Sequence, residues 1–323
     1  MRLLSRPSRL LSPLTPASVD GLLGLCALDP VAGVSLAGQL RRWPDWGVGD
    51  VVAMGGAGRP AAGAWATGSL LPFGLAARPG TGHTGASRAQ VRALAEHSHR
   101  RLTSRGSVYG PAQDVEPVWA ALAELGTVSR EERWSQPLLV APDGPVDLTE
   151  AAVRRRPALR WAAESLHAAT SAEEPLVLPA SVAMFRGELG YDPTAVGGSY
   201  ARHVSWLVQS RRTYVVLDDG EGRPPLPGGP RAVAFKADVG ALWPVPGHDG
   251  GVAQLTGVWT REDLRGRGLA SVALAAVVDA VRAQHVGRRG VVSLYVNDFN
   301  TAALGLYEGL GFTRAGTFAS VLL

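Results

Sequence analysis

The chain has 323 residues, enough for two domains of ordinary size, and its 46% hydrophobic and 19% charged residues indicate a globular rather than a disordered protein. The formal charge of +4 comes almost entirely from arginine, since Lys236 is the only lysine. These arginines are scattered without interleaved aromatic residues, so a nucleic-acid-binding surface is not predicted, and coding bias explains the composition more simply.

Cys26 is the only cysteine, so the chain cannot form an intramolecular disulfide or a cysteine metal cluster, and its apolar neighbours predict a core position. The histidines show no metal-binding spacing, and no metal site is predicted. No apolar stretch reaches the ~20 residues of a membrane span, and the first 16 residues lack an uninterrupted apolar segment of signal-peptide length. We therefore expect a cytoplasmic protein without a membrane contact.

The sequence of the N-terminal half predicts strands and helices on either side of a glycine-rich loop, GTGHTG, at residues 80–85. The segment after this loop has apolar residues at helical spacing. In chain order we expect a strand at residues 64–71, a helix at 86–104, a strand at 107–109, a helix at 115–125 and a closing strand at 136–140.

The C-terminal half shows the same order more clearly. We expect helices at residues 180–189 and 200–210, antiparallel strands at 213–217, 231–239 and 252–260, a helix at 269–283, a strand at 291–296, a helix at 300–309 and a closing strand at 317–323. Proline, glycine and three arginines at residues 141–156 mark the best boundary, which gives domains at 1–150 and 151–323. The fold class is therefore α/β, with two copies of one topology.

The segment RGRGLA at residues 265–270 lies between a predicted strand and a predicted helix. Small residues let the backbone approach an anion closely, and the free N–H groups of a first helical turn point toward it. Arg265 and Arg267 add positive charge, so the segment is suited to a pyrophosphate. It is not a Walker loop, because no Gly-Lys-Ser/Thr follows, and it lacks the third glycine of a dinucleotide fingerprint.

This segment resembles the coenzyme A signature of the GNAT acetyltransferases, Arg/Gln-x-x-Gly-x-Gly/Ala, through Arg265, Gly268 and Ala270. A second GNAT signature is matched at the family's spacing by Asn300, Ala303, Tyr307, Gly311 and Phe312. The whole chain also resembles a subgroup with an extra N-terminal domain that is itself a degenerate GNAT fold, most closely in SVAMFRGELG, VAFKADVGA and VSLYVNDFN. The fold implied is two tandem GNAT-like domains, each a mixed, mainly antiparallel twisted sheet flanked by helices.

The resemblance implies an N-acetyltransferase that uses acetyl-coenzyme A as co-substrate and a primary amine as acceptor. The amine would attack the thioester directly, and Tyr307 would protonate the departing thiolate. The implied cofactor contacts are Val258, Trp259 and Thr260 for the pantetheine and thioester, Arg265, Gly266, Arg267, Gly268, Leu269, Ala270 and Ser271 for the pyrophosphate, and Asn300 for the pantetheine arm.

The general base is left open by the sequence. Many family members carry a glutamate on the strand before the loop, but residues 252–260 contain no carboxylate. Glu188, Asp238 and Asp298 are alternatives, although Asp238 shares a strand face with Lys236 and could form no more than a surface ion pair with it.

Three further alternatives remain at this point. The protein could bind acetyl-coenzyme A as a sensor or scaffold without turnover, or it could use a different acyl donor. The loop at residues 80–85 is predicted to be the N-terminal counterpart of residues 265–270, and a second coenzyme A there is the weaker alternative. The acceptor, whether a small molecule or a protein amine, and the oligomeric state are not specified by the sequence.

Overall fold

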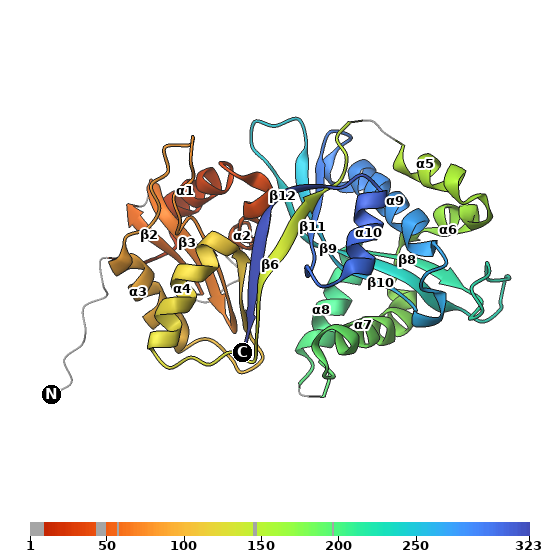
Figure 1. The fold of residues 1–323 in the computed structure, drawn as a ribbon, viewed down its shortest axis with the longest axis horizontal. Coiled ribbons are helices and arrows are strands. Elements are labelled where there is room, and N and C mark those ends of the chain that lie inside the picture. Colours follow the sequence, from red (N-terminus) through yellow and green to blue (C-terminus); the bar gives the residue numbers. More distant parts are fainter. Residues whose placement is uncertain (1–9, 43–49, 57, 145–146, 196) are drawn as a thin grey trace.

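The computed structural model describes residues 10–42, 50–56, 58–144, 147–195 and 197–323. Most of the N-terminal segment considered above, and residues 145 and 146 of the predicted boundary, lie outside these ranges. The two halves of the chain lie side by side, with the N-terminal half in red to yellow and the C-terminal half in green to blue (Figure 1).

The N-terminal half begins with two helices whose first turns are capped by the side chains of Thr15 and Asp29 and contain a proline. Its helices are α1 (Pro16–Cys26), α2 (Pro30–Leu40), α3 (Arg88–His99) and α4 (Ala112–Glu124). Its strands are β1 (Ser12–Pro13), β2 (Val51–Gly56), β3 (Arg59–Thr67), β4 (Ser69–Phe73), β5 (Ser107–Pro111) and β6 (Glu131–Val140).

The C-terminal half contains every helix and strand that the sequence predicts there, with ends shifted by a few residues. Its helices are α5 (Leu148–Arg155), α6 (Arg160–Ser165), α7 (Glu174–Leu189), α8 (Ser199–Gln209), α9 (Leu269–Val281) and α10 (Thr301–Gly309). Its strands are β7 (His167–Ala168), β8 (Thr213–Asp218), β9 (Ala232–Pro244), β10 (Gly251–Thr260), β11 (Val291–Tyr295) and β12 (Thr313–Leu322).

Two expectations for the N-terminal half need correction. The single strand predicted at residues 64–71 is wrong, because Gly68, with a φ of +73°, reverses the chain between β3 and β4. The helix predicted at 86–104 is shorter, since it begins after Ser87 and ends at His99. The sequence interpretation also missed α1, α2 and β2, whereas Cys26 is buried as predicted.

The strands form one continuous sheet of 12 strands in the order β1-β2-β3-β4-β5-β12-β6-β11-β10-β9-β8-β7. The closing strands are exchanged between the halves, because β12 pairs with β5 of the N-terminal half and β6 pairs with β11 of the C-terminal half. The strand pairs β12–β5, β6–β11 and β12–β6 are all antiparallel. The two strands run side by side through the middle of the molecule (Figure 1).

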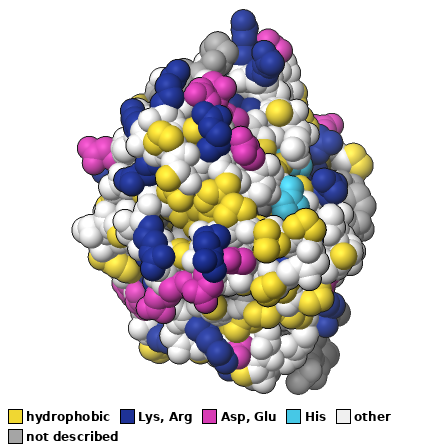
Figure 2. Space-filling view, turned by 90° about the vertical axis from the view of Figure 1, so that its right-hand side faces the viewer, with side chains coloured by type: hydrophobic (Ala, Val, Ile, Leu, Met, Phe, Trp, Pro, Cys, Tyr) yellow, Lys and Arg dark blue, Asp and Glu magenta, His cyan; other side chains and the backbone are white. Residues whose placement is uncertain are grey.

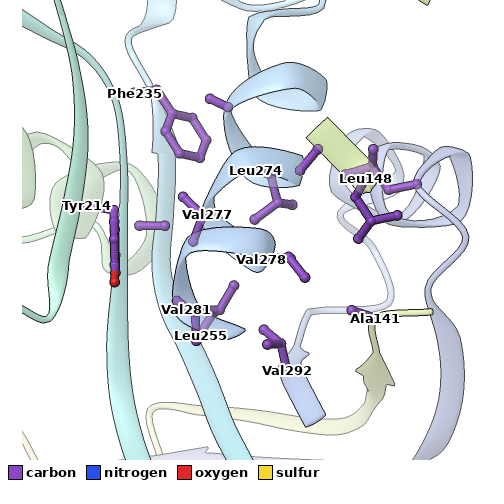
Figure 3. Packing of buried hydrophobic residues seen from close by; sticks show 14 of the residues in the cluster. Ala141, Leu148, Tyr214, Phe235, Leu255, Leu274, Val277, Val278, Val281 and Val292 are labelled. Carbon is purple, nitrogen blue, oxygen red and sulfur yellow. The ribbon is translucent and has the colours of Figure 1, made fainter. Parts of the chain in front are cut away.

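The helix α9 is the centre of the C-terminal core. Figure 3 shows it between Phe235 and Leu255 of the sheet on one side and Leu148 of α5 on the other. By length and composition, the helical stretch Leu269–Val286 is apolar enough to cross a membrane. Its burial inside the fold accounts for that composition, because a helix covered on both sides carries apolar residues all round.

A substitution at Phe318 of β12 can test whether the exchanged strand makes the two halves unfold together. Its side chain is 1% exposed, and its hydrophobic cluster contains Leu36 of the N-terminal half and Trp243 of the C-terminal half. We expect Phe318→Ala to lower the free energy of unfolding by about 3–5 kcal/mol in urea titrations, because it leaves a cavity in this shared core. Calorimetry should still show one transition, shifted to lower temperature.

The matched control is Val128→Ala, since Val128 is 79% exposed and should change stability by less than ~0.5 kcal/mol. If calorimetry showed two separate unfolding transitions and Phe318→Ala shifted only one of them, the two halves would not unfold together and the prediction would be wrong.

Candidate functional site

The candidate site begins where two parallel strands separate. β10 and β11 are paired at Val252, Ala253 and Gln254 only, although β10 continues to Thr260. Beyond this point the described part of β11 offers β10 no partner, so the two strands separate. The predicted residues Val258, Trp259 and Thr260 lie on β10 past the last of these pairs, half-buried.

A β-bulge shapes β10 at the same place. On its other side β10 pairs with β9, where Thr256 lies opposite Asp238 and Trp259 opposite Lys236. Two residues of β10, Gly257 and Val258, thus occupy the space of one residue of β9, and Gly257 has a φ of +58°. Such a bulge takes the extra residue out of the ladder and changes the direction of its peptide groups.

The glycine loop leads from β10 to an open helix end. Gly266 and Gly268 have φ values of +72° and +85°, and Gly268 is the N-cap of α9. Among the described residues no side chain caps α9, so the N–H groups of its first turn stay available to an anion. Arg265 folds the loop back by donating from Nε to the carbonyl oxygen of Thr260 at 3.1 Å.

The base of this loop is fixed to the neighbouring hairpin by Arg261. Its two terminal nitrogens donate to the carboxylate of Asp218, each at 2.7 Å, and its Nε donates to Asp263 at 2.7 Å. These hydrogen bonds hold the pKa of Arg261 above its usual value. A bidentate pair of this kind restricts orientation as well as distance, so the loop starts from a defined position.

The structure adds Arg156, which sequence reasoning missed. Arg156 follows α5, far from the glycine loop in the sequence, but its side chain lies directly on Gly268. A Cβ atom on Gly268 would be 2.5 Å from the Cζ of this guanidinium. The positive φ of Gly268 favours glycine here, any side chain would also displace the Arg156 guanidinium, and a third arginine joins Arg265 and Arg267 at the loop.

Asn300 has a structural role that the sequence did not predict. Its Oδ1 accepts the N–H of Ala303 at 3.1 Å and so caps α10. The side chain is exposed, and its amide N–H groups remain able to donate.

Tyr307 lies in the same hydrophobic cluster as Val258, Leu269 and Ala270, so the predicted residues of the loop and of α10 are brought together. Its side chain is 5% exposed and packs against Phe312, with 5.6 Å between ring centroids. Its hydroxyl meets no hydrogen-bond partner in the part of the chain described. Burial, and then the negative charge of Glu188, raise the pKa of Tyr307, so the phenol stays protonated at neutral pH.

Glu188 is the carboxylate that the structure brings to this region. It ends α7, and its Oε1 lies 3.7 Å from a terminal nitrogen of Arg133. Burial raises its pKa above the ordinary glutamate value, although Arg133 partly lowers it. Because the side chain is 53% exposed, this desolvation is partial and water still reaches the carboxylate. Its negative charge also raises the pKa values of Tyr200, Tyr295 and Tyr307.

The other two candidate bases are placed differently. Asp298 is exposed after β11. The surface ion pair considered for Asp238 and Lys236 is wrong, because the Lys236 side chain is 0% exposed and its Nζ lies 2.6 Å from Asp238 Oδ2 in the interior. The sequence did not show this burial, since both faces of β9 are covered.

The N-terminal half supplies one wall of this region. The ring of Tyr191, between α7 and α8, lies 5.2 Å from the Arg105 guanidinium and 5.1 Å from that of Arg130. Arg133 of β6 donates to the Glu188 carbonyl oxygen at 3.2 Å. Cation–π and hydrogen-bond contacts from the N-terminal half therefore hold the α7–α8 segment.

In the N-terminal half, the segment just before the glycine loop is bound by the protein's own carboxylate. Asp114 of α4, fully buried, accepts the N–H of Gly74 at 3.1 Å and that of Ala76 at 2.8 Å, and it pairs with Arg78 at 2.8 Å. An internal anion thus takes the backbone donors before the loop. Residues 81–84 border a groove of about 960 Å³ together with α1 instead.

The helix after that loop is also closed. Ser87 accepts the N–H of Gln90, and the Gln90 side chain accepts the N–H of Ser87, which forms a capping box at α3. This capped helix end therefore differs from the open end of α9.

The face of the C-terminal half seen in Figure 2 carries basic, acidic and hydrophobic side chains intermixed. No single sign of charge dominates the side chains coloured there. Three arginines, Arg156, Arg265 and Arg267, lie at the glycine loop.

Comparison with known proteins agrees with this geometry. Residues 200–312 match the acetyltransferase (GNAT) family, and residues 49–162 match a domain of unknown function, DUF4081. No curated protein matches the sequence.

Solved structures resemble the chain over nearly its whole length. A tandem GNAT protein from the clavulanic acid biosynthesis pathway has a TM-score of 0.51 at 16% identity, covering 97% of this chain and 98% of its own. A Drosophila protein has a TM-score of 0.56 at 11% identity, with 97% and 98% covered. These similarities show that the fold is that of tandem GNAT proteins, as predicted. Within the C-terminal half, residues 200–312 match the GNAT family, and the chain as a whole shares the fold of tandem GNAT proteins.

Proposed function

We propose that this protein is an N-acetyltransferase that transfers the acetyl group of acetyl-coenzyme A to a primary amine. The observation that carries the proposal is the uncapped N-terminus of α9 behind the glycine loop, which follows the part of β10 that has separated from β11. The proposal includes domains at residues 1–150 and 151–323, with β6 and β12 exchanged between them, and a cytoplasmic location, where acetyl-coenzyme A is available.

The loop residues fit a pyrophosphate. The Arg156 guanidinium lies on Gly268, whose positive φ turns the backbone so that N–H groups can face one anion. We assign the pyrophosphate to the N–H groups of residues 266–271 with Arg156, Arg265 and Arg267 around them, the thioester to the backbone of residues 258–260, and the pantetheine arm to the Asn300 amide.

The reaction proposed needs three contributions from the protein. Acetyl-coenzyme A supplies a thioester whose carbonyl carbon accepts the amine. Glu188, directly or through a water molecule, takes the proton that the amine loses as its nitrogen bonds to this carbon. The N–H of Val258 stabilises the negative charge that develops on the carbonyl oxygen. Tyr307 donates its proton to the sulfur as the carbon–sulfur bond breaks.

The test is to incubate the protein with acetyl-coenzyme A and a panel of small-molecule and peptide amines while following free thiol, alongside calorimetry of cofactor binding. Thiol release that depends on an amine supports the proposal. Binding without release over the whole panel would favour a sensor or scaffold, and absence of binding would reject both functions. Propionyl- and succinyl-coenzyme A in the same assay test the acyl donor.

Arg156 should contribute to phosphate binding, although it lies outside the family motif. We expect Arg156→Ala to weaken coenzyme A binding about 10- to 100-fold in calorimetry, because a hydrogen bond to a charged group contributes ~1.5–3 kcal/mol. Arg154→Ala removes the same charge from an exposed position in the last turn of α5 and should change the affinity less than about twofold. If both variants lost the same coenzyme A affinity, the effect would come from net charge and not from a contact made by Arg156.

Glu188 should set the acid limb of the pH profile. Its pKa is raised, so the basic form increases as pH rises through a value above the ordinary 4.5, and kcat/KM should rise over that interval. Arg133→Gln removes a charge that lowers this pKa and should move the limb to higher pH. Glu188→Gln should abolish the limb and lower kcat about 100-fold. An unchanged limb in Glu188→Gln would exclude this residue as the base.

Tyr307 should affect the chemical step rather than binding. We expect Tyr307→Phe to lower kcat about 10- to 100-fold, because the thiolate then leaves without a proton donor. The calorimetric affinity for acetyl-coenzyme A should stay within about twofold, since the ring keeps its contact with Phe312. Parallel losses of kcat and affinity would instead indicate a packing role.

A further inference from the structure

Lys236, the only lysine of the chain, lies in the interior directly beneath the bulge of β10. Its Nζ donates to Asp238 Oδ2 at 2.6 Å and to the carbonyl oxygen of Gly257 at 3.3 Å. The second oxygen of Asp238 accepts from Thr213 Oγ1 of β8 at 2.8 Å. A chain of three polar side chains thus runs across the sheet from β8 and ends on one peptide carbonyl of the bulge.

The pair is packed tightly against the bulge. A Cβ atom on Gly257 would lie 2.6 Å from Asp238 Oδ2, 3.1 Å from Lys236 Nζ and 3.3 Å from the sulfur of Met184. Only glycine leaves room for the two charged groups at this point. The left-handed φ of Gly257 and the burial of the ion pair therefore depend on each other.

A buried ion pair is weak evidence for stability, because apolar residues of the same volume often stabilise a core as well or better. This one has a specific geometric effect. A trans peptide unit is planar, so its C=O and N–H point in opposite directions. Lys236 donates to the carbonyl oxygen of Gly257, and the N–H of the same unit, which belongs to Val258, therefore points the opposite way, away from the Lys236 ammonium.

The choice of lysine also follows from this geometry. An ammonium group is compact and has three donors, so it can serve Asp238 and a peptide carbonyl in a space closed by Met184. A planar guanidinium would need more room. Every other basic side chain except histidine in this protein is arginine, which makes the exception at position 236 a property of the site.

We propose that Lys236, supported by Asp238 and Thr213, is a positioning residue that fixes the Gly257–Val258 peptide so that the Val258 N–H meets the thioester carbonyl of the acyl donor. This inference rests on the proposed function, since it concerns the same site. Lys236 touches neither the cofactor nor the reacting atoms, and it acts through the backbone of the bulge.

The test compares acetyl-coenzyme A with S-ethyl-coenzyme A, a thioether that lacks the carbonyl oxygen, by calorimetry on the full-length protein. Wild type should bind acetyl-coenzyme A about five- to tenfold more tightly, the effect of one hydrogen bond. Lys236→Met should reduce this ratio to near one and leave the affinity for free coenzyme A within about twofold. Lys236→Arg should not keep the wild-type ratio, although it keeps the positive charge.

Two further variants separate positioning from loss of folding. Thr213→Val removes only the outermost hydrogen bond and should lower the ratio partly, which keeps the inference testable if Lys236→Met does not fold. Arg78→Met breaks the other buried ion pair, Arg78 with Asp114, far from the bulge in the N-terminal half, and should leave the ratio unchanged.

The outcomes distinguish this inference from the proposed function. A wild-type protein that binds no coenzyme A would overturn both. If the wild-type protein binds acetyl-coenzyme A and S-ethyl-coenzyme A equally well, the positioning role is overturned. It is also overturned if Lys236→Met and Thr213→Val weaken the binding of both ligands equally. Neither result contradicts the proposed binding of coenzyme A. A ratio that falls in these two variants but not in Arg78→Met supports it.

Discussion

The antiparallel pairing of β6 with β12 is the contact on which the rest of this structure depends. Each strand comes from one half of the chain and pairs with a strand of the other, so neither half has a complete sheet of its own. The exchange explains why the N-terminal half contributes to the site. Arg133 belongs to β6, where it pairs with Ser320 of β12, and its side chain reaches the carboxylate of Glu188 at the end of α7.

The two glycine loops differ in what satisfies their backbone donors. In the N-terminal half, Asp114 accepts two backbone N–H groups next to the loop, and Ser87 and Gln90 close the helix that follows. In the C-terminal half α9 has no such cap, and arginines surround its first turn. The same topology thus gives one helix end that is capped by the protein's own side chains and one whose first N–H groups are left without a side-chain cap.

Sequence reasoning succeeded where the information was local. The C-terminal strands and helices have strong apolar periods, and the loop of residues 265–270 stands between its strand and helix in the chain itself. It missed α1 and α2, because glycines and small residues weaken their helical pattern and burial supports them instead. The exchange of β6 and β12, Arg156 on Gly268, and Arg133 beside Glu188 join residues distant in sequence, and no spacing rule could have shown them.

The missing carboxylate on β10 has a physical explanation in the same structure. Asp238 and Lys236 lie immediately beneath the bulge, in an interior where charges are poorly screened. A glutamate on β10 at this place would put a second negative charge near Asp238, compete for the single ammonium and have its own pKa raised by burial and repulsion together. Glu188 avoids this conflict, because it stands at the end of α7, half exposed to water and beside Arg133. The buried lysine and the carboxylate on α7 are therefore two parts of one arrangement: the charge that orients the bulge stays inside, and the charge suited to accept a proton lies where solvent can exchange it.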